Sequence, residues 1–122
     1  MIERDFLLRQ IQQAIQALAA VLLSKRNGTP EAQVALAEGL QMVTGMDAAR
    51  LARLSREATL DLARDEGAFS PEMAVAVADL LRESGDDALR ARARWLYEAV
   101  LAAGEVAPLD IHERIAALPA EA

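Results

Sequence analysis

Residues 2–26 read IERDFLLRQIQQAIQALAAVLLSKR and predict one long helix, because they contain neither proline nor glycine. Large apolar residues recur three or four apart in it, which places their side chains on one face at 3.6 residues per turn. They are Leu8, Ile11, Ile15, Leu18 and Leu22, and a second line of Leu7, Ala14 and Val21 widens the same face. The second half of this helix is apolar almost all round, so we expect neighbouring helices on several sides of it.

Capping residues and glycines divide the rest of the chain into further helices. The start signals are Thr29-Pro30-Glu31, Asp47, Ser70-Pro71-Glu72, Asp86 and Asp110, and the stop signals are Asn27-Gly28, Gly45, Glu66-Gly67, Gly85 and Gly104. The third helix, which Asp47 caps, is expected to run to Glu66 with a buried stripe of Leu51, Leu54, Ala58 and Leu62. Asp110 has capping-box spacing with Glu113. Gly39 interrupts the second helix, which indicates either a close helix crossing or a local weakness.

These elements predict an all-α fold, with a long lead helix, two antiparallel helical hairpins and a short C-terminal helix in a tetratricopeptide-like helical array or bundle. The 122 residues suffice for one domain, expected over residues 1–118 with a frayed tail at residues 119–122. Residues 29–40 and 70–81 agree at six of twelve positions, as a repeated hairpin would. Two copies are fewer than the three that a solenoid usually needs, so duplication and chance similarity both stay open.

The chain contains no cysteine and carries a formal net charge of −6. Residues 1–27 hold four basic and two acidic residues, whereas the remainder holds nine and seventeen. Such an acidic body repels phosphate backbones, so we expect no nucleic-acid partner. No segment approaches roughly 18 to 20 uninterrupted apolar residues, and the N-terminus lacks the basic start of a signal peptide. We therefore expect a cytoplasmic protein that makes no membrane contact.

The opening residues Ile2-x-Arg4-Asp5-Phe6-x-x-Arg9-Gln10-Ile11 resemble the start of a bacterial family known only as a domain of unknown function. Further along, Leu80-Leu81-x-x-x-Gly85-Asp86 and Leu96-Tyr97-x-Ala99-Val100 are similar to the turn and second helix of a tetratricopeptide repeat. The resemblance implies a helical fold and an interaction role, with no activity attached.

Carboxylates on the expected third helix are the first candidate for chemistry. Glu57, Asp61 and Asp65 recur every four residues, so they could bind a hard cation or act as paired carboxylates. Interleaved arginines favour a solvated face instead. His112, the only histidine, has no base or ligand partner at a recognisable spacing and is expected on the surface. We assign no catalytic residue, metal or cofactor, and keep a small metal-dependent enzyme that uses these carboxylates as the alternative function.

A basic cluster in the acidic half of the chain is the second candidate. It consists of Arg90 and Arg94, four residues apart, with Arg82 and Arg92 nearby. The cluster could dock an acidic peptide or a phosphate, unless neighbouring acids neutralise it. Met42 and Met46, four residues apart, are expected to fill the core rather than line a binding groove. Trp95 is expected to be a buried anchor between the last two hairpin helices.

The start of the lead helix carries more apolar surface than one core can bury. Phe6, Leu7 and Leu8 are consecutive, so they cannot all face the same side, and an exposed remainder favours pairing. We therefore predict a non-enzymatic protein-interaction module that forms a symmetric homodimer along the lead helices or binds another bacterial protein. The expected interaction residues are Phe6, Leu7, Arg82, Arg90 and Arg94. Membrane-surface attachment through the same helix is disfavoured, because its polar side holds glutamines rather than basic residues.

Overall fold

A computed structural model of the chain describes residues 2–28, 31–104 and 107–119. In chain order the elements are α1 (Ile2–Arg26), α2 (Glu31–Thr44), α3 (Ala48–Leu51), α4 (Arg56–Asp61), β1 (Arg64–Asp65), β2 (Ala68–Phe69), α5 (Pro71–Leu81), α6 (Asp87–Ala102) and α7 (Ile111–Ala116). The two strands form one short antiparallel hairpin. The expected all-α class is confirmed for the part of the chain that is described.

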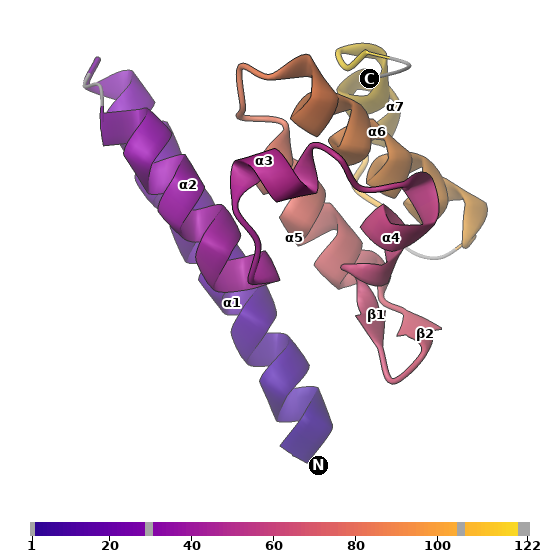
Figure 1. Cartoon of the computed structure of the whole chain (residues 1–122). Helices are drawn as coiled ribbons and strands as arrows, with labels where there is room; N and C mark the ends of the chain where they lie inside the picture. The colour runs from indigo at the N-terminus through magenta and orange to yellow at the C-terminus, as the bar shows by residue number, and fades with distance from the viewer. Residues whose placement is uncertain (1, 29–30, 105–106, 120–122) are drawn as a thin grey trace.

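Helices α1 and α2 pack against each other in opposite directions, and α5, α6 and α7 form the other side of the molecule (Figure 1). Helix α1 also contacts α5, so it joins the two sides as the expected central helix. Because α2 is shorter than α1, the N-terminal part of α1 extends past the end of α2 (Figure 1). Asp65 of β1 and Glu72 of α5 lie beside that part of α1.

The side of α1 that faces the core is not the side that carries most of its large apolar residues. Ala14, Ala17 and Val21 are buried, so the line that was expected only to widen the face lies at its centre. Leu7, Ile11 and Leu18 are partly buried against the core. Leu8, Ile15 and Leu22 are 51%, 57% and 45% exposed, which corrects the expectation that the large residues face inward. Small residues occupy the centre because α2 and α5 both approach α1 closely there.

Gly39 makes this close approach possible. A Cβ atom added at Gly39 would lie 2.8 Å from Ala17 Cβ and 3.6 Å from Leu80 Cδ2. The glycine therefore stands where α2 crosses α1 and meets α5, and the close crossing is the correct one of its two interpretations.

The prediction of one continuous third helix is wrong, because a second capping residue divides this segment into α3 and α4. The Ser55 hydroxyl accepts a hydrogen bond from the Ala58 amide at 3.0 Å, so α4 begins after a break that follows α3. A serine in this position competes with the helix by bonding its own backbone neighbours. After α4, Glu66 and Gly67 adopt positive φ angles of 52° and 83° and turn β1 into β2. The segment after α2 therefore differs from the long α6 that follows α5, and the sequence repeat has no counterpart there.

Capping residues set the other helix starts as expected. Asp47, Ser70 and Asp86 each accept a hydrogen bond from a backbone amide in the first turn of the following helix. Asp110 makes no such bond, and its Oδ1 lies 3.0 Å from Arg114 Nε one turn later, so the expected capping box is wrong. The start signal at residues 29–30 and the end of the expected tail, residues 120–122, lie outside the described residues.

Candidate functional site

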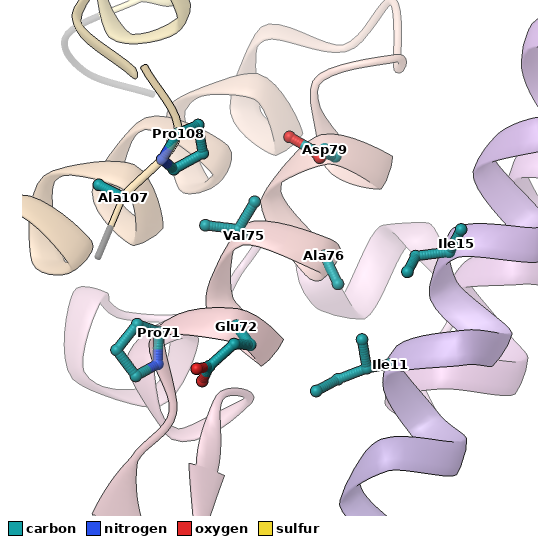
Figure 2. A pocket seen from close by; sticks show the side chains of 9 residues that line it. All are labelled: Ile11, Ile15, Pro71, Glu72, Val75, Ala76, Asp79, Ala107 and Pro108. Atoms are coloured by element: carbon teal, nitrogen blue, oxygen red, sulfur yellow. The ribbon is translucent and has the colours of Figure 1, made fainter. Parts of the chain in front are cut away.

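A shallow apolar groove lies across α5, with α1 as one wall and residues 107–108 as the other (Figure 2). Its volume is about 410 Å³. Helix α5 supplies the floor with Val75 and Ala76, and Ile11 and Ile15 of α1 face it from the side (Figure 2). Helix periodicity explains the set on α5, since residues three, four and seven apart share one face.

The groove continues toward the N-terminus of α1. A second hollow of about 370 Å³ shares Ile11 and Glu72 with the first and adds Leu7, Leu8 and Asp65. We call the two hollows together the α1 groove, and the exposed residues Leu8, Ile15 and Leu22 the α1 stripe. Leu8 and Ile15 of the stripe line the groove, and Leu22 follows seven residues after Ile15 on the same helix. One apolar surface therefore runs from the side of α1 onto α5.

The charged groups that line the α1 groove are acidic. Asp65, Glu72 and Asp79 are its only charged lining residues among those described. Glu72 is exposed and receives a long 3.4 Å hydrogen bond from the Ser70 hydroxyl. Neither Asp65 nor Glu72 forms an ion pair with a described basic residue, so both can accept a cation from outside.

Asp79 differs from the other two acids because it is already paired. The buried Tyr97 hydroxyl donates a hydrogen bond to Asp79 Oδ1, and Arg114 Nη1 lies 2.8 Å from the same oxygen. Burial first, and then Asp79, raise the pKa of Tyr97 well above its ordinary value. Tyr97 therefore stays protonated at neutral pH, and this network joins α5, α6 and α7 rather than activating a nucleophile.

The expected row of carboxylates does not form. Helix α4 ends at Asp61, and Asp65 lies on β1, so the four-residue spacing no longer places them on one helix face. Asp61 Oδ1 instead pairs with Arg64 Nε at 2.7 Å. Within the described ranges no group of three or more His, Cys, Asp or Glu residues is arranged to hold a metal ion. His112 is exposed, as expected.

The arginine cluster is engaged within the fold. Arg90 Nη2 donates to the Ala117 carbonyl at 3.0 Å, and Arg94 Nη1 donates to the Leu118 carbonyl at 2.9 Å. Cations suit the carbonyl end of a helix, so these two arginines hold the end of α7 on α6. Arg82 Nε lies 3.5 Å from Glu83 Oε2. These contacts give Arg90 and Arg94 a structural role that their spacing did not indicate.

The other expected interaction residues divide between surface and core. Phe6 is 58% exposed, and Leu8 beside it is exposed as well, so the expected excess of apolar surface is present. Leu7 packs against the core. Ile15 and Leu22 belong to the same surface, and only their heptad spacing from Leu8 could have identified them.

Met42 and Trp95 lie elsewhere than expected. Met42 is 57% exposed, so it does not fill the core, whereas Met46 packs against it. Trp95 is half-buried between two guanidinium groups, with Arg92 4.8 Å and Arg56 5.3 Å from its ring centroid. Arg92 also donates to the Leu54 carbonyl through Nε and Nη2, so this stack fixes the start of α4 on α6. Arg92 precedes Trp95 by three residues, about one helical turn, so this contact could have been predicted from their spacing in the sequence.

One helix stretch, Phe6–Arg26, is long and apolar enough by length and composition to cross a membrane. Its mean hydropathy is 1.3, because isolated glutamines do not cancel the surrounding leucine, isoleucine and alanine. Core helices and N-terminal signal sequences meet the same criterion, so this stretch alone does not place the protein in a membrane.

Comparison with protein-family models, with curated proteins and with solved structures finds no significant match to this chain. The resemblance of the opening residues to a bacterial family therefore stays an expectation.

Proposed function

We propose that this protein is a non-enzymatic protein-interaction module that associates with a second copy of itself through the α1 stripe and the α1 groove. One observation carries the proposal: Leu8, Ile15 and Leu22 are large, about half exposed and spaced seven apart on α1, and the first two of them line an apolar groove. Scattered apolar residues are normal on a surface, but an aligned set beside a hollow is typical of an interaction face.

The stripe has the spacing that helix pairing needs. Its residues lie seven apart, and the partly buried Ile11 and Leu18 fall between them, so spacings of four and three alternate as in a coiled-coil seam. A self-complementary patch of this kind closes a dimer about a two-fold axis.

The size of the stripe sets the strength of the expected association. Full burial of a leucine or isoleucine stabilises by about 1.5 to 3 kcal/mol, so six half-exposed side chains contribute roughly 6 kcal/mol. Association itself costs about 4 kcal/mol or more. The stripe alone therefore gives a weak dimer, and a stable one requires contacts in the groove as well.

Light scattering over a dilution series tests the proposal. The wild-type chain is expected to approach twice the mass of one chain at high concentration, and Ile15→Glu is expected to remain monomeric because each dimer would then bury two carboxylates. Met42→Glu is the matched control, since Met42 is equally exposed but lies on α2, outside the α1 groove. Leu7→Glu is unsuitable because Leu7 packs against the core.

Circular dichroism of each variant establishes that it is folded. A wild-type chain that stays monomeric at every concentration, or a dimer that Ile15→Glu leaves intact, would refute self-association through α1.

A further inference from the structure

We propose that the second copy docks antiparallel, so that each α1 lies in the α1 groove of the other copy and brings Arg26 to the acids Asp65 and Glu72. This inference rests on the proposed self-association and adds the direction and the recognition chemistry of the pair.

The stripe is symmetric about its middle residue. Leu8 and Leu22 each lie seven residues from Ile15, so reversing one helix about Ile15 exchanges them. An antiparallel pair then sets Leu8 against Leu22 of the second copy, with the two Ile15 side chains at the two-fold axis. The apolar contacts of the antiparallel and the parallel pair are therefore equivalent, and charge has to decide between them.

The two ends of α1 stand in opposite electrostatic surroundings. Helices α1 and α5 run in the same direction, because Leu7 and Leu8 lie beside Glu72 near the start of both, and Lys25 lies beside Glu83 near the end of both. Asp65 and Glu72 are thus at the N-terminal end of α1, where they add two negative charges beside Leu7 and Leu8.

The other end of α1 supplies the matching cation. Lys25 Nζ is paired with Glu83 Oε1 at 3.0 Å, whereas Arg26 is exposed and forms no ion pair with a described residue. In a parallel pair the two Arg26 side chains would lie beside each other. In the antiparallel pair each Arg26 lies one turn before Leu8 of the other copy, and opposite helix dipoles also meet.

The direction of the Arg26 side chain favours contact with these acids. Helical side chains lean toward the N-terminus of their own helix. When the helices run antiparallel, this direction leads from the position of Arg26 toward Leu8 of the other copy, which lies beside Asp65 and Glu72. A second copy also suits the charge of the groove, because residues 1–27 have a positive net charge and the rest of the chain is acidic.

Single cysteines report the direction of the pair, since the chain has none of its own. Leu8→Cys and Leu22→Cys are prepared separately, mixed and oxidised. The cross-linked chains are digested with trypsin without reduction, and the disulfide-linked peptides are identified by mass spectrometry, because position 8 lies in residues 5–9 and position 22 in residues 10–25. Disulfides require Cα atoms within about 7 Å. The antiparallel pair is expected to yield the disulfide between position 8 of one copy and position 22 of the other. Little of the 8–8 or the 22–22 disulfide is expected. Ile15→Cys alone should cross-link, and Val34→Cys, which is exposed on α2, should not.

A charge exchange tests the contact itself. Arg26→Glu is expected to weaken the dimer about tenfold, because a symmetric pair loses the contact twice. Glu72→Arg in the same chain should restore most of the affinity, and Arg53→Glu, at an exposed arginine outside the groove, should not weaken the dimer.

The outcomes separate the arrangement from the function. A dimer by light scattering that yields only symmetric Leu8 and Leu22 disulfides is parallel, which overturns this inference and leaves self-association standing. A chain that is monomeric in solution, or that associates only with lipid vesicles, overturns both.

Discussion

Replacing Gly39 with alanine tests whether the close crossing of α1 and α2 is as tight as the structure shows. The added Cβ would lie 2.8 Å from Ala17 Cβ, 0.6 Å inside ordinary van der Waals contact, which begins at 3.4 Å. Ala17 is buried on the core side of α1, so neither atom can rotate away and the helices have to separate.

Two opposing terms set the magnitude. Overpacking a well-filled core costs about 1 to 3 kcal/mol, whereas alanine in place of glycine stabilises a helix by about 1 kcal/mol. We expect Gly39→Ala to lower the free energy of unfolding by about 1 kcal/mol, which corresponds to a decrease in Tm of about 4 °C. Without the contact, the same change would raise Tm by a similar amount.

The reciprocal change provides the decisive comparison. Ala17→Gly alone should cost about 1 to 2 kcal/mol, through lost helix propensity and a lost methyl group. Combined with Gly39→Ala it exchanges the two residues across the contact, so the propensity terms cancel and stability should return to within about 1 kcal/mol of wild type. Ala37→Gly, at an exposed site on α2, measures the propensity term by itself.

Urea unfolding monitored by circular dichroism at fixed protein concentration gives the four free energies. The expected coupling between positions 17 and 39 is about 1 to 2 kcal/mol in favour of the double variant. Additive effects, within about 0.5 kcal/mol, would show that the helices are not in contact there and would refute the explanation of why small residues occupy the centre of α1.

Two further variants probe α6. Tyr97 has a raised pKa in the fold, so its contribution to stability is present below the unfolded pKa of about 10 and decreases as pH rises above it. Absorbance at 295 nm, which reports ionisation of the only tyrosine, should rise together with unfolding. The Tyr97→Phe variant should not lose stability in this alkaline range. Trp95→Ala should cost about 2 to 3 kcal/mol in thermal melts, less than for a fully buried indole, because the indole is only partly buried and its ring lies against the guanidinium groups of Arg56 and Arg92. A cost below about 1 kcal/mol would show that the stack does not hold α4.

Local signals in the sequence determined where most helices begin and end. The bounds of α1 follow from a proline-free and glycine-free run that ends at Asn27-Gly28. Ser70 and Asp86 cap α5 and α6 because a short polar side chain satisfies an amide that the helix itself leaves unpaired. Such signals act within four residues, so they can be read without knowledge of the fold.

Expectations failed where tertiary contacts decide the outcome. Both apolar lines of α1 have helical spacing, and only the approach of Gly39 and Leu80 explains why Ala17 is inside and Ile15 outside. The groove joins α1 to α5, which are separated by more than forty residues, so no spacing within the sequence indicates it. Ser55 is the exception, because it was a readable cap inside the expected third helix.

The position of α1 between α2 and α5 also has a consequence for synthesis on the ribosome. Helix α1 leaves the exit tunnel before the helices that pack against it, and α5, the later of its two main packing partners, ends 55 residues after it, at Leu81. At 5 to 20 residues per second, the nascent helix waits about 3 to 11 s with apolar side chains on both its core side and its stripe uncovered. During that interval the same surface that would later pair two finished copies is open to chaperones and to neighbouring chains on the same message.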